Sequence, residues 1–216
     1  MFRRKKSDET EDGATPDEAE SPEGPRSRGP WDASEVTLTE DDPERIDLGG
    51  LVLTPHEGLE LQLQVDEASG TPIAVILAGE TGAVELRAFA APRHGDIWGD
   101  VRRQVAGEIA RMGGTATESE GPYGTEVAVS LTVDRGDGQR VQQASKVVGI
   151  AGPRWLLRAT LFGRPAVEHL EDGDVEQALR DVVVVRGTTP IPPGDALPLT
   201  MPANAQRMDQ RMEAPE

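Results

Sequence analysis

The sequence predicts an α+β domain, with a mainly antiparallel sheet and one long and one short helix packed on one face of it. Several segments alternate apolar and polar residues with a period of two, which is typical of half-buried strands. One segment instead spaces its apolar residues by three and four, as a helix does. The links between neighbouring strands are also too short for parallel crossovers, which need about a dozen residues or more.

The first three strands are predicted at residues 59–65, 73–78 and 84–90. The first of them alternates leucine and valine with glutamate and glutamine, and the other two are apolar runs. Turn-forming residues separate them at 66–70 and 79–82, so we expect two antiparallel hairpins.

A long helix follows the third strand. Its start is predicted at Asp96 as the N-cap and its end at Gly113-Gly114. The residues that share one face of this helix are Trp98, Val101, Val105, Ile109 and Met112.

Three more strands are predicted at residues 127–133, 141–150 and 154–162, with turns at 134–138 and 151–153. A short helix capped by Asp174 and a β-branched strand at 182–185 complete the domain, which we place at residues 45–187. The order strands, helix, strands, helix, strand favours an antiparallel sheet with its helices on one face. A core of about 140 residues can bury roughly two thirds of its unfolded surface and so can fold alone.

Polar segments flank this domain. Residues 1–44 hold 6 Lys and Arg against 14 Asp and Glu and have few apolar side chains, so we predict a disordered acidic tail. Closely spaced prolines in 188–202 predict an extended arm, and 203–216 is predicted to be a disordered tail.

Charge and composition exclude several classes of protein. A net charge of −17 repels phosphates, which argues against general nucleic-acid binding. The absence of cysteine excludes disulfides, thiolate nucleophiles and iron–sulfur clusters. The basic start, 1–6, is followed by acidic residues rather than an apolar stretch, and no segment has the roughly 20 apolar residues of a membrane span, so a cytoplasmic location is expected.

Motifs of known catalytic chemistry are also absent from the sequence. The three histidines, His56, His94 and His169, lie in predicted loops without the spacing of metal ligands. The stretch 79–82, Gly-Glu-Thr-Gly, lacks the lysine of a phosphate-binding loop and is interpreted as a hairpin turn. We therefore predict no cofactor, no metal and no catalytic residue.

One group of charged residues suggests a binding site. If 151–153 is a three-residue hairpin loop, Lys146 faces Arg158 and Ile150 faces Arg154, with Glu126 one strand away. Like charges opposite each other are unfavourable, so a negative group is expected near them. An acid of the protein itself is the simpler candidate, and an anionic ligand or an acidic partner segment is the alternative.

Arg93, in the loop before the long helix, is a further candidate for binding an anion. Asp96 would already occupy the helix start there, which favours a structural role for this loop.

A series of motifs resembles an actinobacterial family of unknown function. They occur in order as Gly29-Pro30-Trp31-Asp32, 47–51, 88–93, Ile97-Trp98 with Val101-Arg102, Gly121-Pro122-Tyr123-Gly124-Thr125-Glu126, the segment 149–158 with its Gly-Pro-Arg-Trp-x-Leu-Arg core, 184–187 and 192–199. The resemblance implies no activity, cofactor or catalytic residue. It does imply that the ordered region begins near residue 29. In element order the domain also looks like the Mog1/PsbP-type sandwich, a likeness of fold alone.

Three functions remain open from the sequence. A non-enzymatic binding or adaptor domain for a protein partner is preferred, because a well-defined core lacks catalytic motifs and carries polar tails. An enzyme of unrecognised type acting on an anionic small molecule is the main alternative, and an accessory nucleic-acid protein is the weakest. The oligomeric state is left open.

Overall fold

The computed structural model describes residues 26–39, 42–134 and 138–202. Of the acidic tail predicted at 1–44, residues 1–25 and 40–41 lie outside the described residues, as does the whole tail predicted at 203–216. Within the described part, seven strands form the main sheet in the order β4-β5-β6-β10-β9-β8-β7, and each neighbouring pair is antiparallel. Its strands are β4 (Glu60–Val65), β5 (Pro72–Ala78), β6 (Gly82–Ala90), β7 (Thr115–Gly121), β8 (Gly124–Asp134), β9 (Arg140–Gly152) and β10 (Trp155–Gly163).

A second, smaller sheet has the order β1-β11-β3-β2 among the described residues. Its strands are β1 (Trp31–Asp32), β2 (Ile46–Asp47), β3 (Leu51–Leu53) and β11 (Val183–Val184). The β1–β11 pair is parallel and the other pairs are antiparallel. Trp31 of the N-terminal segment therefore pairs with the strand that ends the predicted domain.

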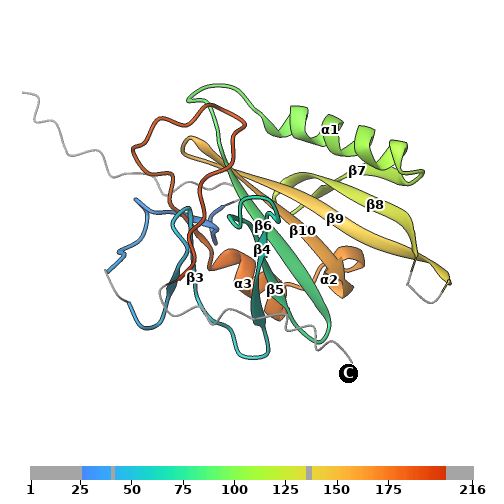
Figure 1. Cartoon of the computed structure of the whole chain (residues 1–216), viewed down its shortest axis with the longest axis horizontal. Coiled ribbons are helices and arrows are strands. Elements are labelled where there is room, and N and C mark those ends of the chain that lie inside the picture. The colour runs from blue at the N-terminus through green and yellow to red at the C-terminus, as the bar shows by residue number, and fades with distance from the viewer. Residues whose placement is uncertain (1–25, 40–41, 135–137, 203–216) are drawn as a thin grey trace, which may run out of the picture.

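The helices lie on opposite faces of the main sheet (Figure 1). The helix α1 (Trp98–Arg111) packs on one face through a core that includes Val127, Val147 and Leu156. The short helices α2 (Arg164–Val167) and α3 (Asp174–Arg180) belong to the other face, where α3 packs in the larger core. The α+β class and the mainly antiparallel sheet are confirmed, whereas the placement of both helices on one face is wrong.

The hairpin between β9 and β10 explains this difference. Trp155 pairs with Gly152 and Leu157 with Ile150, so the loop holds only Pro153 and Arg154. The predicted pairing of Ile150 with Arg154 is wrong by three residues. Because side chains alternate between faces, an odd shift moves one strand's side chains to the other face of the sheet.

The larger core fills the space between the second sheet, α3 and one face of the main sheet. The arm predicted at 188–202 contributes to this core, since Leu197 and Leu199 are buried. Leu199 also forms an isolated antiparallel β-bridge with Gly49. Trp155 is the largest fully buried side chain in this core.

The ends of the helices differ slightly from the prediction. The carboxylate of Asp96 accepts the N–H of Trp98 at 2.7 Å, although Ile97 holds the N-cap position of α1. Gly113 has a φ of 77° and ends the helix as predicted. Asp174 is the first residue of α3 rather than its cap, because the N-cap is Gly173.

Candidate functional site

The five charged residues singled out in the sequence lie in three separate places. Lys146 and Glu126 come together, with Nζ and Oε2 3.6 Å apart. Arg158 lies on the opposite face of the sheet, paired in register with Gly149 and 3.8 Å from the carboxylate of Glu85. The expected convergence of Lys146 with Arg158 is therefore not found.

Arg93 and Arg154 border a third region, a depression of about 370 Å³ between the 91–97 loop and the β9–β10 hairpin. Both side chains belong to exposed residues. Arg154 is the one described non-glycine residue with positive φ, at 64°. Pro153 and Arg154 are the two residues of the hairpin loop, and a negative φ at the proline followed by a positive φ at the next residue is the pattern of a type II turn.

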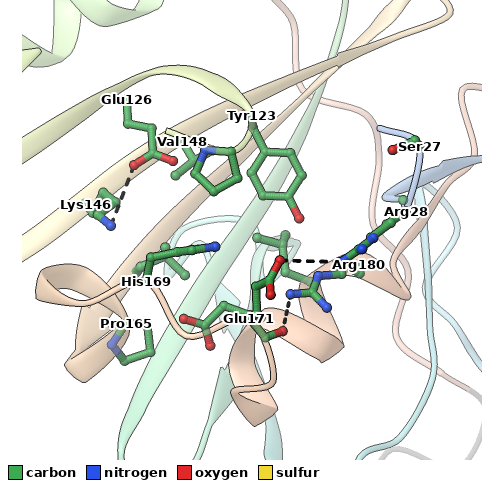
Figure 2. Close-up of a pocket in the computed structure, with 15 residues that line it drawn as sticks. Ser27, Arg28, Tyr123, Glu126, Lys146, Val148, Pro165, His169, Glu171 and Arg180 are labelled. Carbon is green, nitrogen blue, oxygen red and sulfur yellow. Dashed lines mark hydrogen bonds and ion pairs between the residues drawn. The ribbon is translucent and has the colours of Figure 1, made fainter. Parts of the chain in front are cut away.

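Lys146 and Glu126 lie in a pocket of about 200 Å³ that four segments of the chain enclose (Figure 2). The segments are the N-terminal stretch 27–29, the turn between β7 and β8, strands β8, β9 and β10 of the main sheet, and the region of α2 and α3. Its charged and titratable residues are Arg28, Tyr123, Glu126, Lys146, His169, Glu171, Glu176 and Arg180.

The turn Gly121-Pro122-Tyr123-Gly124 builds one wall of this pocket. Gly121 pairs with Gly124, which leaves Pro122 and Tyr123 as the loop, and Gly124 has a φ of 97°. A Cβ at Gly121 would overlap the carboxyl group of Glu126. Glycine at this position therefore makes room for the buried Glu126 side chain.

Burial dominates the electrostatics in the interior of the pocket. Burial raises the pKa of Glu126 above its ordinary value, and Lys146 opposes this rise only in part. Burial likewise raises the pKa of the Tyr123 hydroxyl, against the effect of Arg180. Glu176 is 7 % exposed, and its Oε2 has no hydrogen-bond partner among the described residues.

More exposed charges surround the mouth of the pocket. Arg28 and Glu171 form an ion pair of 3.6 Å, with side chains 72 % and 70 % exposed. The Arg180 guanidinium donates to the main-chain carbonyl of Glu171 (Figure 2). His169 is an exposed residue beside them.

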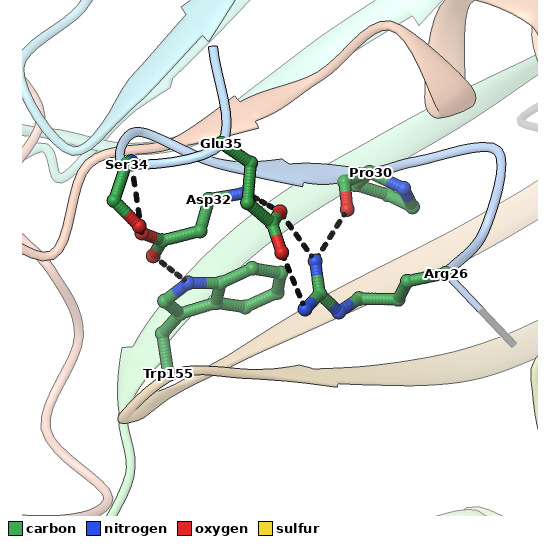
Figure 3. A network of polar contacts seen from close by, with 6 residues as sticks. All are labelled: Arg26, Pro30, Asp32, Ser34, Glu35 and Trp155. Atoms are coloured by element: carbon green, nitrogen blue, oxygen red, sulfur yellow. Dashed lines mark hydrogen bonds and ion pairs between the residues drawn. The ribbon is translucent and has the colours of Figure 1, made fainter. Parts of the chain in front are cut away.

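A polar network holds the N-terminal wall in place (Figure 3). The guanidinium of Arg26 donates to both carboxylate oxygens of Glu35 and to the carbonyl of Pro30, and it also lies over the Trp155 ring at 5.2 Å. Asp32 accepts the indole N–H of Trp155 at 2.6 Å. Ser27, Arg28 and Gly29 are thus fixed beside the pocket by contacts on either side of them.

A family model described as "Protein of unknown function (DUF3710)" matches residues 29–208. The chain belongs to this family. The resemblance to a family of unknown function is thereby confirmed. A comparison with curated proteins found no match.

The DUF3710 match contains every residue that lines the pocket except Ser27 and Arg28. The motifs of the resemblance included the Gly121–Glu126 turn, but Tyr123 was not expected to be a site residue. Sequence reasoning also missed His169, Glu176 and Arg180. The signal that was available is the turn itself, which places an aromatic hydroxyl three residues before a glutamate.

Two further kinds of site are not found among the described residues of this DUF3710 chain. Its helices include none that combines the length and apolar character of a membrane span. Its histidines and carboxylates, over the same residues, form no group of three that could hold a metal ion.

Proposed function

We propose that this domain binds a small polar molecule in the pocket formed by Tyr123, Glu126, Lys146 and Glu176. The observation that carries the proposal is the placement of buried charge. Of the charged residues that are buried in the described part of the chain, Asp32, Glu126 and Glu176, the last two line the pocket.

Buried charges are costly unless hydrogen bonds or ion pairs compensate them. Asp32 has this compensation, since Ser34 and Trp155 donate to its carboxylate. Glu126 has an ion pair of 3.6 Å to Lys146, and Glu176 leaves one oxygen unpaired. Glu126 therefore retains capacity to accept a hydrogen bond from a ligand, and the Oε2 of Glu176, which is buried against Gly173, would accept one only after its side chain turns toward the pocket.

The size of the pocket limits the ligand to a small molecule. Its volume of about 200 Å³ is well above the roughly 10–15 Å³ that one water molecule needs on the same measure, so the pocket admits a small molecule. The walls combine these polar groups with Val148, Leu161 and Leu179, a mixture that is common in ligand sites.

Binding accounts for this arrangement more simply than catalysis does. Tyr123, His169 and Glu126 could each transfer a proton, and groups with shifted pKa values gather at active sites. This keeps an enzyme acting on a small molecule as the second candidate. The raised pKa of Glu126 is the observation that favours it.

The adaptor role favoured by the sequence is compatible with ligand binding. The N-terminal stretch 27–29 forms part of the pocket wall, so a ligand would contact the segment that leads into the acidic tail. Under the proposal, a protein partner would respond to the occupied pocket.

A single-residue reporter tests the proposal. Tyr123 is the one tyrosine of the chain, so full-length protein with isotope-labelled tyrosine gives a ring signal from the pocket alone. We expect at least one compound from a library of small polar metabolites, or an extract of the native cell, to shift this signal to saturation.

Two variants make the test specific. Glu126→Gln should weaken the response about tenfold or more, whereas Glu60→Gln, on the exposed edge strand β4, should leave it unchanged. Ligand binding at this site would be refuted if no compound shifts the Tyr123 signal, or if the shift is as large in Glu126→Gln as in the wild type.

A further inference from the structure

Charge is distributed unevenly between the interior and the mouth of the pocket. The interior holds the carboxylates of Glu126 and Glu176, which are 5 % and 7 % exposed, and the ammonium of Lys146. Its formal charge is therefore negative by one. The mouth holds Arg28 and Arg180 against Glu171, a formal charge that is positive by one before any protonation of His169.

The carboxylates in the interior of the pocket favour a ligand group that is a cationic hydrogen-bond donor. Glu176 is more than nine-tenths buried and lines the pocket, and its Oε2, which lies against Gly173, has no hydrogen-bond partner in the described chain. An ionised carboxylate can only accept hydrogen bonds, and an ammonium group supplies three donors. Lys146 is engaged with Glu126, so its ammonium does not meet the need of Glu176.

The charges at the mouth of the pocket favour a ligand group that is an anionic hydrogen-bond acceptor. The one carboxylate there, Glu171, is paired with Arg28. The guanidinium of Arg180 has the main-chain carbonyl of Glu171 and the Tyr123 hydroxyl as partners, and no carboxylate in the ion pairs of the described residues. A planar guanidinium suits a carboxylate, because two parallel N–H groups can donate to its two oxygens.

Between these two ends the walls are apolar. Val148, Leu161 and Leu179 are buried and line the same pocket, together with the ring of Pro165. They suit a short aliphatic body between a polar head and a polar tail.

We propose that the ligand is a small zwitterion of the amino-acid class, which enters with its ammonium group toward Glu176 and Glu126 and leaves its carboxylate at Arg180. This inference rests on the proposed ligand-binding function. A ligand with negative charge alone would bring that charge against two buried carboxylates. A simple amine would leave Arg180 without an anionic partner.

The experiment compares matched ligands on the full-length wild-type chain with the Tyr123 signal as readout. The probes are the standard amino acids with β-alanine and 4-aminobutanoate. For the zwitterion that binds best, the two analogues that lack either its carboxylate or its amine are then titrated. We expect the zwitterion to bind and each analogue to bind about tenfold more weakly or worse.

Two variants locate the two ends of the ligand. Glu176→Gln should lower affinity for the zwitterion and for the amine analogue but not for the acid analogue. Arg180→Gln should show the opposite selectivity. The comparison of ligands uses wild-type protein, so the proposal can still be tested if one of these variants fails to fold.

The inference is overturned if no zwitterion shifts the Tyr123 signal at concentrations on the order of 10 mM, or if the acid analogue binds as well as the zwitterion. If other polar metabolites still shift the signal, ligand binding stands and only the zwitterion assignment fails. If no compound of any class shifts it, the proposed function fails as well.

Discussion

The indole nitrogen of Trp155 donates a hydrogen bond of 2.6 Å to the carboxylate of Asp32, which lies 123 positions earlier in the chain. Both residues are buried, and Trp155 belongs to the larger core. Through this bond the strand β10 anchors the N-terminal segment that carries Arg28 to the pocket (Figure 3). The contact thus links the stability of the fold to the completeness of the site.

Replacing Asp32 by alanine should lower the free energy of unfolding by about 2 kcal/mol, because it leaves the buried Trp155 N–H without an acceptor. Urea denaturation of the full-length chain measures the change. Asp66→Ala is the matched control, since Asp66 accepts the same kind of bonds from Ser69 in an exposed turn. A loss at Asp66 as large as that at Asp32 would contradict the special role of the Trp155 bond.

The contribution of Asp32 should disappear in acid. Burial raises its pKa, but the bonds from Ser34 and Trp155 outweigh burial and hold the pKa below the ordinary value of 3.8. Stability from a carboxylate with a lowered pKa is complete above that value and is lost as the pH falls through the folded pKa. The difference in unfolding free energy between wild type and Asp32→Asn should therefore be constant near neutral pH and shrink below about pH 4.

Glu126 should show the opposite dependence. Its folded pKa lies above 4.5, so its charged form is disfavoured by folding, and wild type should gain stability relative to Glu126→Gln as the pH falls toward 4.5. Lys146, His169 and Glu120 act on this carboxylate, and histidine and glutamate side chains ordinarily titrate in or near this range. Both proteins are therefore compared with His169→Gln and Glu120→Gln in place. A difference that is flat with pH would show that burial does not shift Glu126.

Two glycines of the α1 face should respond to alanine with opposite signs. A Cβ at Gly149 would overlap the Trp98 ring, so Gly149→Ala should cost about 2 kcal/mol through overpacking. Gly107 lies inside α1 and has open space around it apart from an Arg111 nitrogen at 3.8 Å. Gly107→Ala should stabilise by about 0.5–1 kcal/mol. Thermal unfolding distinguishes the two, and a stabilising Gly149→Ala would argue against the packing of α1 on β9.

Arg154→Gly should stabilise the domain by up to about 1 kcal/mol. Arg154 has a φ of 64°, where a side chain is strained and glycine is not. The control is Arg93→Gly, at an exposed residue that borders the same depression without positive φ, and it should be neutral or slightly destabilising. Equal effects of the two changes in denaturant titrations would remove strain as the explanation.

Long periodic segments were predictable from sequence. The strands at 59–65 and 127–133 and the helix that became α1 follow local patterns of burial, and the structure confirms them. The strand β7 was missed because Thr115–Gly121 is a polar edge strand, mostly exposed, with no apolar alternation to read. The strands β1, β2 and β3 have only two or three residues each, too short for a periodic signal.

Only the proximity of Lys146 and Glu126 within the candidate site could be predicted from the sequence. Lys146 and Glu126 lie on neighbouring strands, so their proximity follows from the sheet alone. The other residues of the site come from a turn and from a loop–helix region, and no local sequence pattern predicts where these segments lie. They are Tyr123, His169, Glu176 and Arg180.

The α+β class and most of the longer strands and helices follow from local sequence, because periodicity and turn chemistry act between residues that are close along the chain. The faces on which the helices pack and the pocket beside α2 and α3 follow instead from contacts between distant segments. Both depend on the register of β9 with β10, and the two-residue loop at Pro153 and Arg154 sets that register. Since side chains alternate along a strand, that one loop decides which charges share a face of the sheet and which are separated by it.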